Sequence, residues 1–360
     1  MTGESMLPPW VMGRYGLNAI SDEPLFRNSA PGRGLAAQPL GFIDVGARGG
    51  VHDLVSPIAS MTAVLGFEPD LEACAELNDR LPGHSSWAAT RFLPVAVADR
   101  AGPATLYLCE APTNHSLRPV NRAFAERYRM VKFAQTGRFE LQTQTLDHVL
   151  FSTPPDDRPW GEFVKLDTQG TEFEILQGAE RMLEERTVAA FVEVEFCQIY
   201  EGQKLFSEVE AFFRARGFSF FGFHSTHERA RKALDKRRFA GRERLLHADA
   251  VFFKDPLPGG PALKPLSDRE THVLFTCALL LGYFDYALEL ADATFASTTG
   301  DRASILALIE KLAFNDPAQA RAAAMRLAAA VEKSPDRANV EVGYFVDERR
   351  AMCNFEDVVR

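Results

Sequence analysis

The sequence of 360 residues predicts an α/β protein with a doubly wound sheet, preceded by an irregular arm and followed by an all-helical extension. From residue 41 onwards, short β-rich runs alternate with helical segments, the order that builds a mostly parallel sheet covered by helices. A glycine-rich turn follows the first of these runs, at the place where such sheets bind their ligands. After residue 265 the chain shows only helical patterns until its last residues.

The arm covers residues 1–40, where five prolines interrupt the chain and only a short helix around residues 10–15 is expected. The sheet region covers residues 41–255. Its strands are predicted at 42–45, 62–67, 91–97, 105–108, 163–166, 188–194, 218–223 and 250–253. Apolar residues at helical spacing predict helices at 71–81, 171–185 and 205–216.

A linker rich in Pro and Gly at 256–265 separates the sheet region from the extension, which covers residues 266–360. Four helices are predicted in this extension, at 268–281, 283–296, 302–314 and 317–332. The first two form one helical hairpin, whereas repeat arrays of such hairpins need about three copies. We therefore expect a helical cap that packs on the sheet.

Composition places the chain among ordinary globular proteins. The net charge of −9 argues against a nucleic-acid partner, because nucleic-acid binders usually carry a basic face. The five cysteines form no CxxC pair, which argues against a structural zinc site or a disulfide framework and favours the cytoplasm. We find neither a signal peptide nor an apolar stretch long enough to cross a bilayer, so any membrane contact is expected to be peripheral.

The turn after the first strand is Gly46-Ala47-Arg48-Gly49-Gly50. A dinucleotide fingerprint has its second glycine where this chain has Arg48, whose side chain would crowd a pyrophosphate. The sequence of a phosphate-binding P-loop is also missing. Asp44, just before the turn, suits a positively charged ligand better than a phosphate. S-adenosylmethionine (SAM) carries an ammonium, a sulfonium and a carboxylate but no phosphate, and therefore fits this turn.

Two further segments complete a pocket for a nucleoside. Glu68 ends the second strand 22 residues after Gly46, where its carboxylate can accept hydrogen bonds from both ribose hydroxyls. The run 94–99 ends in Ala98-Asp99, which can set a backbone N–H and a carboxylate beside an adenine edge. NAD enzymes share the acid at the second strand, so the turn rather than Glu68 separates the two cofactors.

Six segments together resemble the FkbM-type SAM-dependent methyltransferases, over about residues 41–223: FIDVGARGG, GFEPD, PVAVAD, TLDHVL, FVKLDTQGTEFEILQGA and FVEVEF. The most specific is the K-x-D-x-x-G-x-E element at Lys165, Asp167, Gly170 and Glu172. The resemblance implies a Rossmann-like, seven-stranded class I methyltransferase sheet. It also implies that SAM donates a methyl group to a hydroxyl of a sugar, a glycan or glycolipid, or a secondary metabolite.

The resemblance assigns the cofactor-binding residues: Asp44, Gly46, Ala47, Arg48 and Gly49 at the methionine end, Glu68 and Pro69 at the ribose, and Ala98 and Asp99 at the adenine. The chain departs from the common wording at Arg48, where Asn is frequent, and at Thr168-Gln169, where Val/Met-Glu is common. The second departure removes one carboxylate near the active face, and with it the basis for a catalytic or metal role at that position.

Methyl transfer to an alcohol needs an aligned nucleophile and usually a base. Asp167, which follows the 163–166 strand, is a candidate base, sulfonium neighbour or metal ligand, unless it only caps the next helix. Glu193 and Glu195 alternate on the next strand and so share one face. His115, in a polar segment after the 105–108 strand, is another candidate base, with an exposed loop histidine as the alternative.

Asp167, Glu193 and Glu195 could hold Mg²⁺ through oxygen ligands, but we expect no metal; they could instead bind substrate hydroxyls or form salt bridges. Asn114 is a candidate contact to the acceptor. The run 224–247 carries eight Lys or Arg residues against three acids, with Arg237 and Arg238 among them. This run predicts recognition of an anionic acceptor, such as a phosphorylated or uronic sugar or a glycolipid head group, unless it is a solvated loop.

The sequence therefore predicts a SAM-dependent O-methyltransferase that acts on a hydroxylated acceptor. One alternative is a non-catalytic module of methyltransferase fold whose helical extension makes protein contacts. A second alternative is an NAD(P)-dependent oxidoreductase on the same kind of sheet, against which Arg48 counts.

Overall fold

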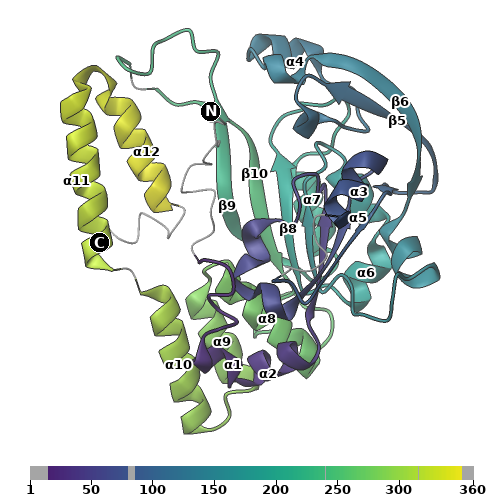
Figure 1. Ribbon diagram of the computed structural model, residues 1–360, viewed down its shortest axis with the longest axis vertical. Coiled ribbons are helices and arrows are strands. Elements are labelled where there is room, and N and C mark those ends of the chain that lie inside the picture. The colour runs from purple at the N-terminus through teal and green to yellow at the C-terminus, as the bar shows by residue number, and fades with distance from the viewer. Residues whose placement is uncertain (1–14, 80–85, 240, 315, 351–360) are drawn as a thin grey trace.

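A seven-stranded sheet lies at the centre of the protein, in the order β3-β2-β1-β7-β8-β10-β9 (Figure 1). The computed structural model describes residues 15–79, 86–239, 241–314 and 316–350. In sheet order the strands span Ala89–Leu93, Thr62–Phe67, Leu40–Val45, Phe163–Leu166, Ala189–Glu195, Arg244–Phe253 and Ser219–Arg229. Pairing is parallel from β3 to β8 and antiparallel on both sides of β10. The predicted seven-stranded, Rossmann-like sheet is confirmed.

Each central strand is buried on both faces and divides its side chains between two cores. In β1, Phe42 packs into one core and Ile43 into the other, and all six residues of the strand are buried. Strands covered on both faces are continuous apolar runs rather than alternating ones. This is why short apolar runs bounded by turns were sufficient to predict them.

Helices from both ends of the chain cover the first face. The α1 (Pro24–Arg27), α2 (Ala30–Ala37), α8 (Asp268–Leu280), α9 (Phe284–Thr294) and α10 (Thr299–Ala313) helices all contribute to it. Residues such as Leu35, Leu274 and Leu290 are fully buried there beside Phe42. The expected helical cap is therefore confirmed for α8 and α9, and α1 and α2 show that the arm contains helices. The short helix expected around residues 10–15 falls almost wholly outside the described residues.

The opposite face of the sheet is covered by α5 (Glu172–Gln177), α6 (Glu180–Glu185) and α7 (Phe206–Arg214). The prediction of one helix over 171–185 was wrong, because the chain breaks between α5 and α6. Gly178 lies at this break, and a Cβ there would stand 2.3 Å from the carbonyl oxygen of Ala98. The α3 helix (Leu71–Asp79) packs beside β3, and α4 (Arg122–Arg127) lies farther from the sheet.

A second, three-stranded sheet has the order β4-β6-β5. Its strands are β4 (Ala96–Val97), β5 (Gly102–Cys109) and β6 (Gln135–Gln144). The single strand predicted at 91–97 is therefore two strands in two sheets. Pro94 lies between them, and it has no N–H to continue a ladder. The β6 strand was not predicted because most of its side chains are exposed and polar, so it carries no apolar signal.

The last helices of the described residues are α11 (Pro317–Lys333) and α12 (Ala338–Arg350), of which only the first was predicted. Figure 1 shows this pair above α10 in the view and away from the sheet. The predicted basic run at 224–247 contributes to both β9 and β10 and to the connection between them. Among the described residues, no helix combines the length and the apolar character needed to cross a bilayer.

Candidate active site

The glycine-rich turn begins where β1 ends, and its first glycine is required by the backbone. Gly46 has φ +89°, and a Cβ there would stand 2.0 Å from the carbonyl oxygen of Asp167. The turn closes through the N–H of Gly50, which donates to the carbonyl oxygen of Ala47 at 2.9 Å. The turn after β1 thus packs directly against the backbone that follows β7. Gly46 and Gly49 are exposed, so a ligand can reach their backbone.

A buried ion pair supports this turn from below. Lys165 Nζ lies 3.2 Å from Asp44 Oδ1 and 3.8 Å from Asp167 Oδ2. Burial by itself lowers the pKa of Lys165, but the two carboxylates outweigh it and raise that pKa, so the ammonium stays charged. The other oxygen of Asp44 accepts the N–H of His52 at 3.0 Å. Asp44 is 1% exposed, and the structure engages both of its oxygens with protein groups.

Glu68 lies at the carboxyl end of β2, the strand next to β1. Its Oε1 accepts the N–H of Asp70 at 2.9 Å, and its own N–H donates to the carbonyl oxygen of Leu93 at 3.1 Å. Burial raises the pKa of Glu68. Arg48 lies 3.9 Å from Asp70, so the turn and the end of β2 also meet through side chains.

The remaining predicted cofactor residues lie in two places. Ala47 and Pro69 follow β1 and β2, and Ala98 and Asp99 follow β4 of the second sheet. Pro69 is half-buried directly after Glu68, and Ala47 is buried in the turn. Ala98 follows β4, where its N–H donates to the carbonyl oxygen of Gln144 at 2.9 Å. Asp99 is exposed beside it.

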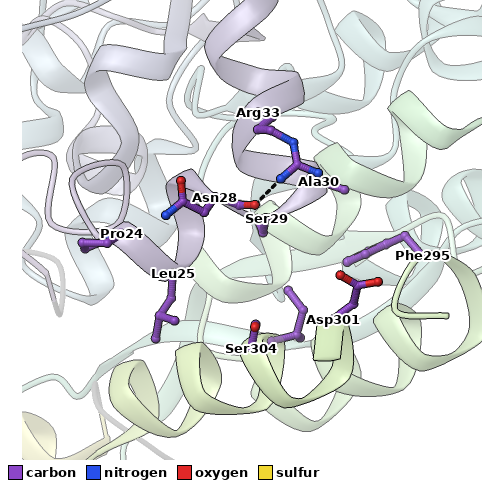
Figure 2. Close-up of a pocket in the computed structure, with 10 residues that line it drawn as sticks. Pro24, Leu25, Asn28, Ser29, Ala30, Arg33, Phe295, Asp301 and Ser304 are labelled. Atoms are coloured by element: carbon purple, nitrogen blue, oxygen red, sulfur yellow. Dashed lines mark hydrogen bonds between the residues drawn. The ribbon is translucent and has the colours of Figure 1, made fainter. Parts of the chain in front are cut away.

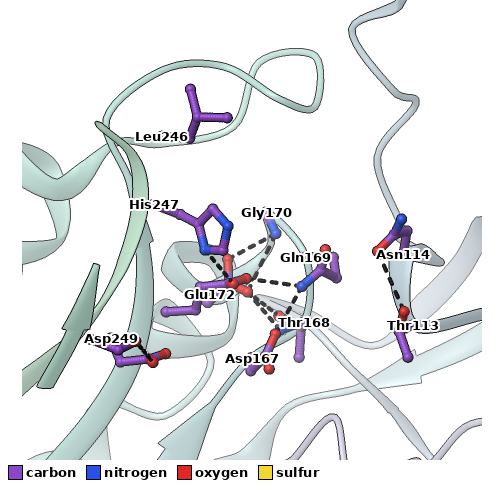
Figure 3. A network of polar contacts seen from close by, with 12 residues as sticks. Thr113, Asn114, Asp167, Thr168, Gln169, Gly170, Glu172, Leu246, His247 and Asp249 are labelled. Carbon is purple, nitrogen blue, oxygen red and sulfur yellow. Dashed lines mark hydrogen bonds and ion pairs between the residues drawn. The ribbon is translucent and has the colours of Figure 1, made fainter. Parts of the chain in front are cut away.

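Three carboxylates gather beyond the ends of β7 and β8. Oxygens of Asp167, Glu172 and Glu193 lie within 4.8 Å of one another. Figure 3 shows Asp167, Glu172 and Gln169 converging at this point. The group shares Asp167 and Glu193 with the predicted metal set but contains Glu172 in place of Glu195. We call these three residues the carboxylate group.

Two members of the carboxylate group, Asp167 and Glu193, have pKa values shifted in opposite directions. Burial works against the charge of Asp167, but Lys165 and the amide of Gln169 outweigh it and lower the pKa of Asp167. Burial and the nearby charge of Asp167 raise the pKa of Glu193 well above its ordinary value. Glu195 is also buried, and this burial raises its pKa. Such a separation distinguishes a base, Asp167, from an acid, Glu193.

We expect Glu172→Gln to gain stability relative to the natural protein as pH rises. Burial raises the pKa of Glu172 from 4.5 to about 7, despite N–H donors at Thr168 and Gly170. The protonated carboxyl favours the folded state below the unfolded pKa, and this contribution is lost as pH rises through about 7. The shift corresponds to at most about 3 kcal/mol. Urea unfolding at pH 5, 6, 7 and 8 measures the difference. Glu72→Gln, at an exposed carboxyl, is the control, and an equal pH dependence in both variants would contradict this prediction.

His247 belongs to this site and was not predicted. Its Nδ1 lies 2.9 Å from Glu193 Oε1, and its ring stacks on His227 with centroids 4.3 Å apart. Burial and His227 lower the pKa of His247 to about 4, so the imidazole is neutral. The signal was available in the strand register, because His247 pairs with Glu195 across β10 and β8. It was missed because the predicted strand began at residue 250.

The structure separates His115 from the carboxylate group. Nδ1 of His115 accepts the N–H of Cys109 at 3.1 Å, and burial together with the charge of Arg48 lowers its pKa. His115 therefore lies on the side of the glycine-rich turn. The carbonyl oxygen of Asn114 accepts the hydroxyl of Tyr200 at 3.1 Å, while the Asn114 amide donates to Lys132.

Arg237 and Arg238 lie in the exposed connection between β9 and β10, which Figure 1 shows projecting towards α11 and α12. Arg237 pairs with Asp235 at 2.6 Å. Asp235 and, more weakly, Asp336 raise the pKa of Arg237. Arg237 thus has a local partner in the structure.

A cavity of about 410 Å³ lies between the arm and α10 rather than at the glycine-rich turn (Figure 2). Its walls include Arg33, Asn28 and Ser29 from the arm, and Asp301 and Ser304 from α10. None of the predicted site residues lines it. We assign the active site to the glycine-rich turn and the carboxylate group, because the exposed glycine backbone and the clustered carboxylates lie there.

Comparison with known proteins identifies a family. Residues 44–220 match the methyltransferase FkbM domain. A crystal structure of methyltransferase FkbM from Methylobacillus flagellatus KT is similar at 12% identity and a TM-score of 0.33, over 60% of this chain and 43% of that chain. The present chain thus spans less than half of that protein's length. None of the curated proteins matches it.

Proposed function

Residues 44–220 of this chain form an FkbM methyltransferase domain, and on that premise we propose that the protein transfers a methyl group from SAM to a hydroxyl. The acceptor we propose is a sugar, a glycan or glycolipid component, or a secondary metabolite. We also propose that the reaction takes place in the cytoplasm, as the spacing of the cysteines favours.

One observation supports the cofactor most directly: a glycine turn with an exposed backbone and a buried carboxylate lie at the ends of two adjacent parallel strands. Gly46 and Glu68 occupy these positions, and ligands of doubly wound sheets bind at this edge. Arg48 at the turn disfavours a pyrophosphate, which supports SAM over NAD(P). We propose that the turn contacts the methionine end, Glu68 the ribose, and Ala98 with Asp99 the adenine.

The carboxylate group supports the chemistry. SAM supplies an electrophilic methyl group on a sulfonium. The acceptor oxygen forms the new O–CH₃ bond as the S–CH₃ bond breaks, and its proton must go to a base. We propose that Asp167 takes this proton, because its lowered pKa keeps it ionised and the backbone after β7 packs against the turn. The proposal for His115 is weaker, since its Nδ1 already accepts a backbone N–H.

We expect titration calorimetry to show SAM binding that Glu68→Ala weakens by about a hundredfold or more. Two charge-assisted hydrogen bonds to the ribose would be lost, each worth about 1.5–3 kcal/mol. Glu72→Ala, an exposed carboxylate on α3, removes the same charge and should bind SAM normally. Binding of NAD instead of SAM would support the oxidoreductase. Binding of neither cofactor would support the non-catalytic module.

The matching activity assay follows labelled methyl from SAM into a panel of glycans and small alcohols. Transfer to a hydroxyl, with Asp167→Asn inactive but still binding SAM, is the expected result. The panel pairs each neutral sugar with its phosphorylated or uronic counterpart. A preference for the anionic member that Arg237→Ala/Arg238→Ala removes would support those arginines as acceptor contacts, and unaltered affinity and salt dependence would exclude them.

A further inference from the structure

Gln169 lies at the centre of the carboxylate group and has an unusual backbone. Its φ is +61°, a left-handed conformation that costs a side-chain-bearing residue about 1–2 kcal/mol. Gly170 follows with φ +96°. Such strain persists where the surrounding structure imposes it, and it gathers at functional sites. Here the strained turn directs the Gln169 side chain between the ends of β7 and β8 (Figure 3).

The amide of Gln169 bridges two of the carboxylates. Its Nε2 donates to Asp167 Oδ1 at 2.9 Å and to Glu193 Oε2 at 2.9 Å. Both N–H bonds of the amide are therefore used, one for each acid. This contact joins Asp167, which follows β7, to Glu193 on the neighbouring β8.

Two hydroxyls fix the other side of Gln169. The buried Tyr200 donates from its hydroxyl to Gln169 Oε1 at 3.0 Å, and Ser116 donates to the backbone carbonyl oxygen at 2.7 Å. A flipped amide would set its oxygen against the ionised carboxylate of Asp167, which has no proton to donate. The network therefore determines which side of the amide faces the acids.

The bridging nitrogen lies between two of the three carboxylates that could hold a cation. Oxygens of three carboxylates within 4.8 Å of one another match the separation of ligands around a divalent ion, whose bonds to oxygen are about 2.0–2.6 Å long. Two of these three carboxylates direct an oxygen at the Gln169 Nε2. An ion at this position would have to displace the amide.

We propose that Gln169 is a positioning residue that replaces a divalent cation. Its neutral amide holds Asp167 and Glu193 together, so that the site keeps its geometry without a metal. A single carboxylate at position 169 would remove the two donors, add a ligand and turn the group into a divalent-cation site. This inference concerns the acids used in the proposed function, but cation binding can be measured whatever the acceptor is.

The experiment compares Mn²⁺ binding, by electron paramagnetic resonance and calorimetry, to the natural protein, Gln169→Glu and Gln198→Glu. Gln198 is exposed and gains the same charge, so it is the matched control. We expect Gln169→Glu to bind one Mn²⁺ per chain at least about tenfold more tightly than the other two, because a fourth carboxylate attracts the ion. A folded Gln169→Glu that binds no more tightly than the control overturns the proposal.

A measurement on the natural protein keeps the proposal testable if Gln169→Glu does not fold. Mn²⁺ is titrated into the natural protein and into Asp167→Asn. We expect the same weak binding in both, because the amide already occupies the site. Tight binding of one Mn²⁺ that Asp167→Asn abolishes would show that a metal displaces the amide, and would overturn the proposal. Because neither titration requires SAM or an acceptor, failure of the proposed function leaves this result interpretable.

Discussion

Replacing Lys165 by methionine is expected to lower the free energy of unfolding by about 3–5 kcal/mol, the cost of leaving a buried charge without its partner. Asp44 is 1% exposed, and Lys165 Nζ is the cation at 3.2 Å from it. Methionine keeps the length and packing of the side chain but removes the charge. Because Lys165 also lies 3.8 Å from Asp167, two carboxylates then remain on one face with no cation between them. Urea unfolding at pH 7 measures the loss.

Two further variants identify the cause. Lys204→Met removes a surface ion pair between Lys204 and Glu208, whose side chains are 43% and 42% exposed respectively. It should lower the free energy of unfolding by less than about 0.5 kcal/mol. Asp44→Asn added to Lys165→Met should recover part of the loss, since the more deeply buried of the two carboxylates then carries no charge. If Lys165→Met were no more destabilising than Lys204→Met, the ion pair would not be what supports the turn.

Gly46→Ala should destabilise the protein by about 2–4 kcal/mol, from left-handed strain and from crowding of a packed backbone. The new Cβ would stand 2.0 Å from the carbonyl oxygen of Asp167, and that atom belongs to the backbone after β7. The turn and the Asp167 segment must therefore move apart. We expect the loss of stability to be accompanied by loss of SAM binding, measured by calorimetry on the folded fraction.

Gly49→Ala is the matched control, because nothing lies within 4 Å of a Cβ built at Gly49. Its stability should stay within about 0.5 kcal/mol of the natural protein. A drop in SAM affinity at unchanged stability would then report close approach of the ligand to Gly49. Equal destabilisation by Gly46→Ala and Gly49→Ala would contradict the steric argument.

The elements that could be predicted are those whose signal is local. The central β1, β2 and β7 are short apolar runs, and they are found where predicted to within two residues. The helix pair α8 and α9 was equally visible in its apolar period. In contrast, β6 exposes polar side chains along most of its length, and its only support is pairing with β4 and β5. A strand that is stabilised mainly by pairing with its neighbours has no apolar pattern in its own sequence by which it could be predicted.

The same distinction, between local sequence signals and contacts made only by the fold, applies to the active site. By itself the sequence determined the glycine-rich turn and the acid that follows the second strand, because each lies within a few residues of a strand end. Asp44 was predicted to suit a positively charged ligand, and the structure shows it paired with Lys165. Nothing near Asp44 in the sequence predicts this pair, because it depends on β7 lying next to β1.

Only the tertiary structure decided how the acids are arranged. Glu172 takes the place expected for Glu195, and His247 reaches Glu193 because β10 runs antiparallel beside β8. Gln169 was visible in the sequence only as a missing carboxylate, whereas its contacts make it a bridge between Asp167 and Glu193. Strand order and register bring these side chains within hydrogen-bond distance. Asp167 and Glu193 could therefore be predicted from local pattern, but their partners, charges and roles depend on contacts between segments far apart in the chain.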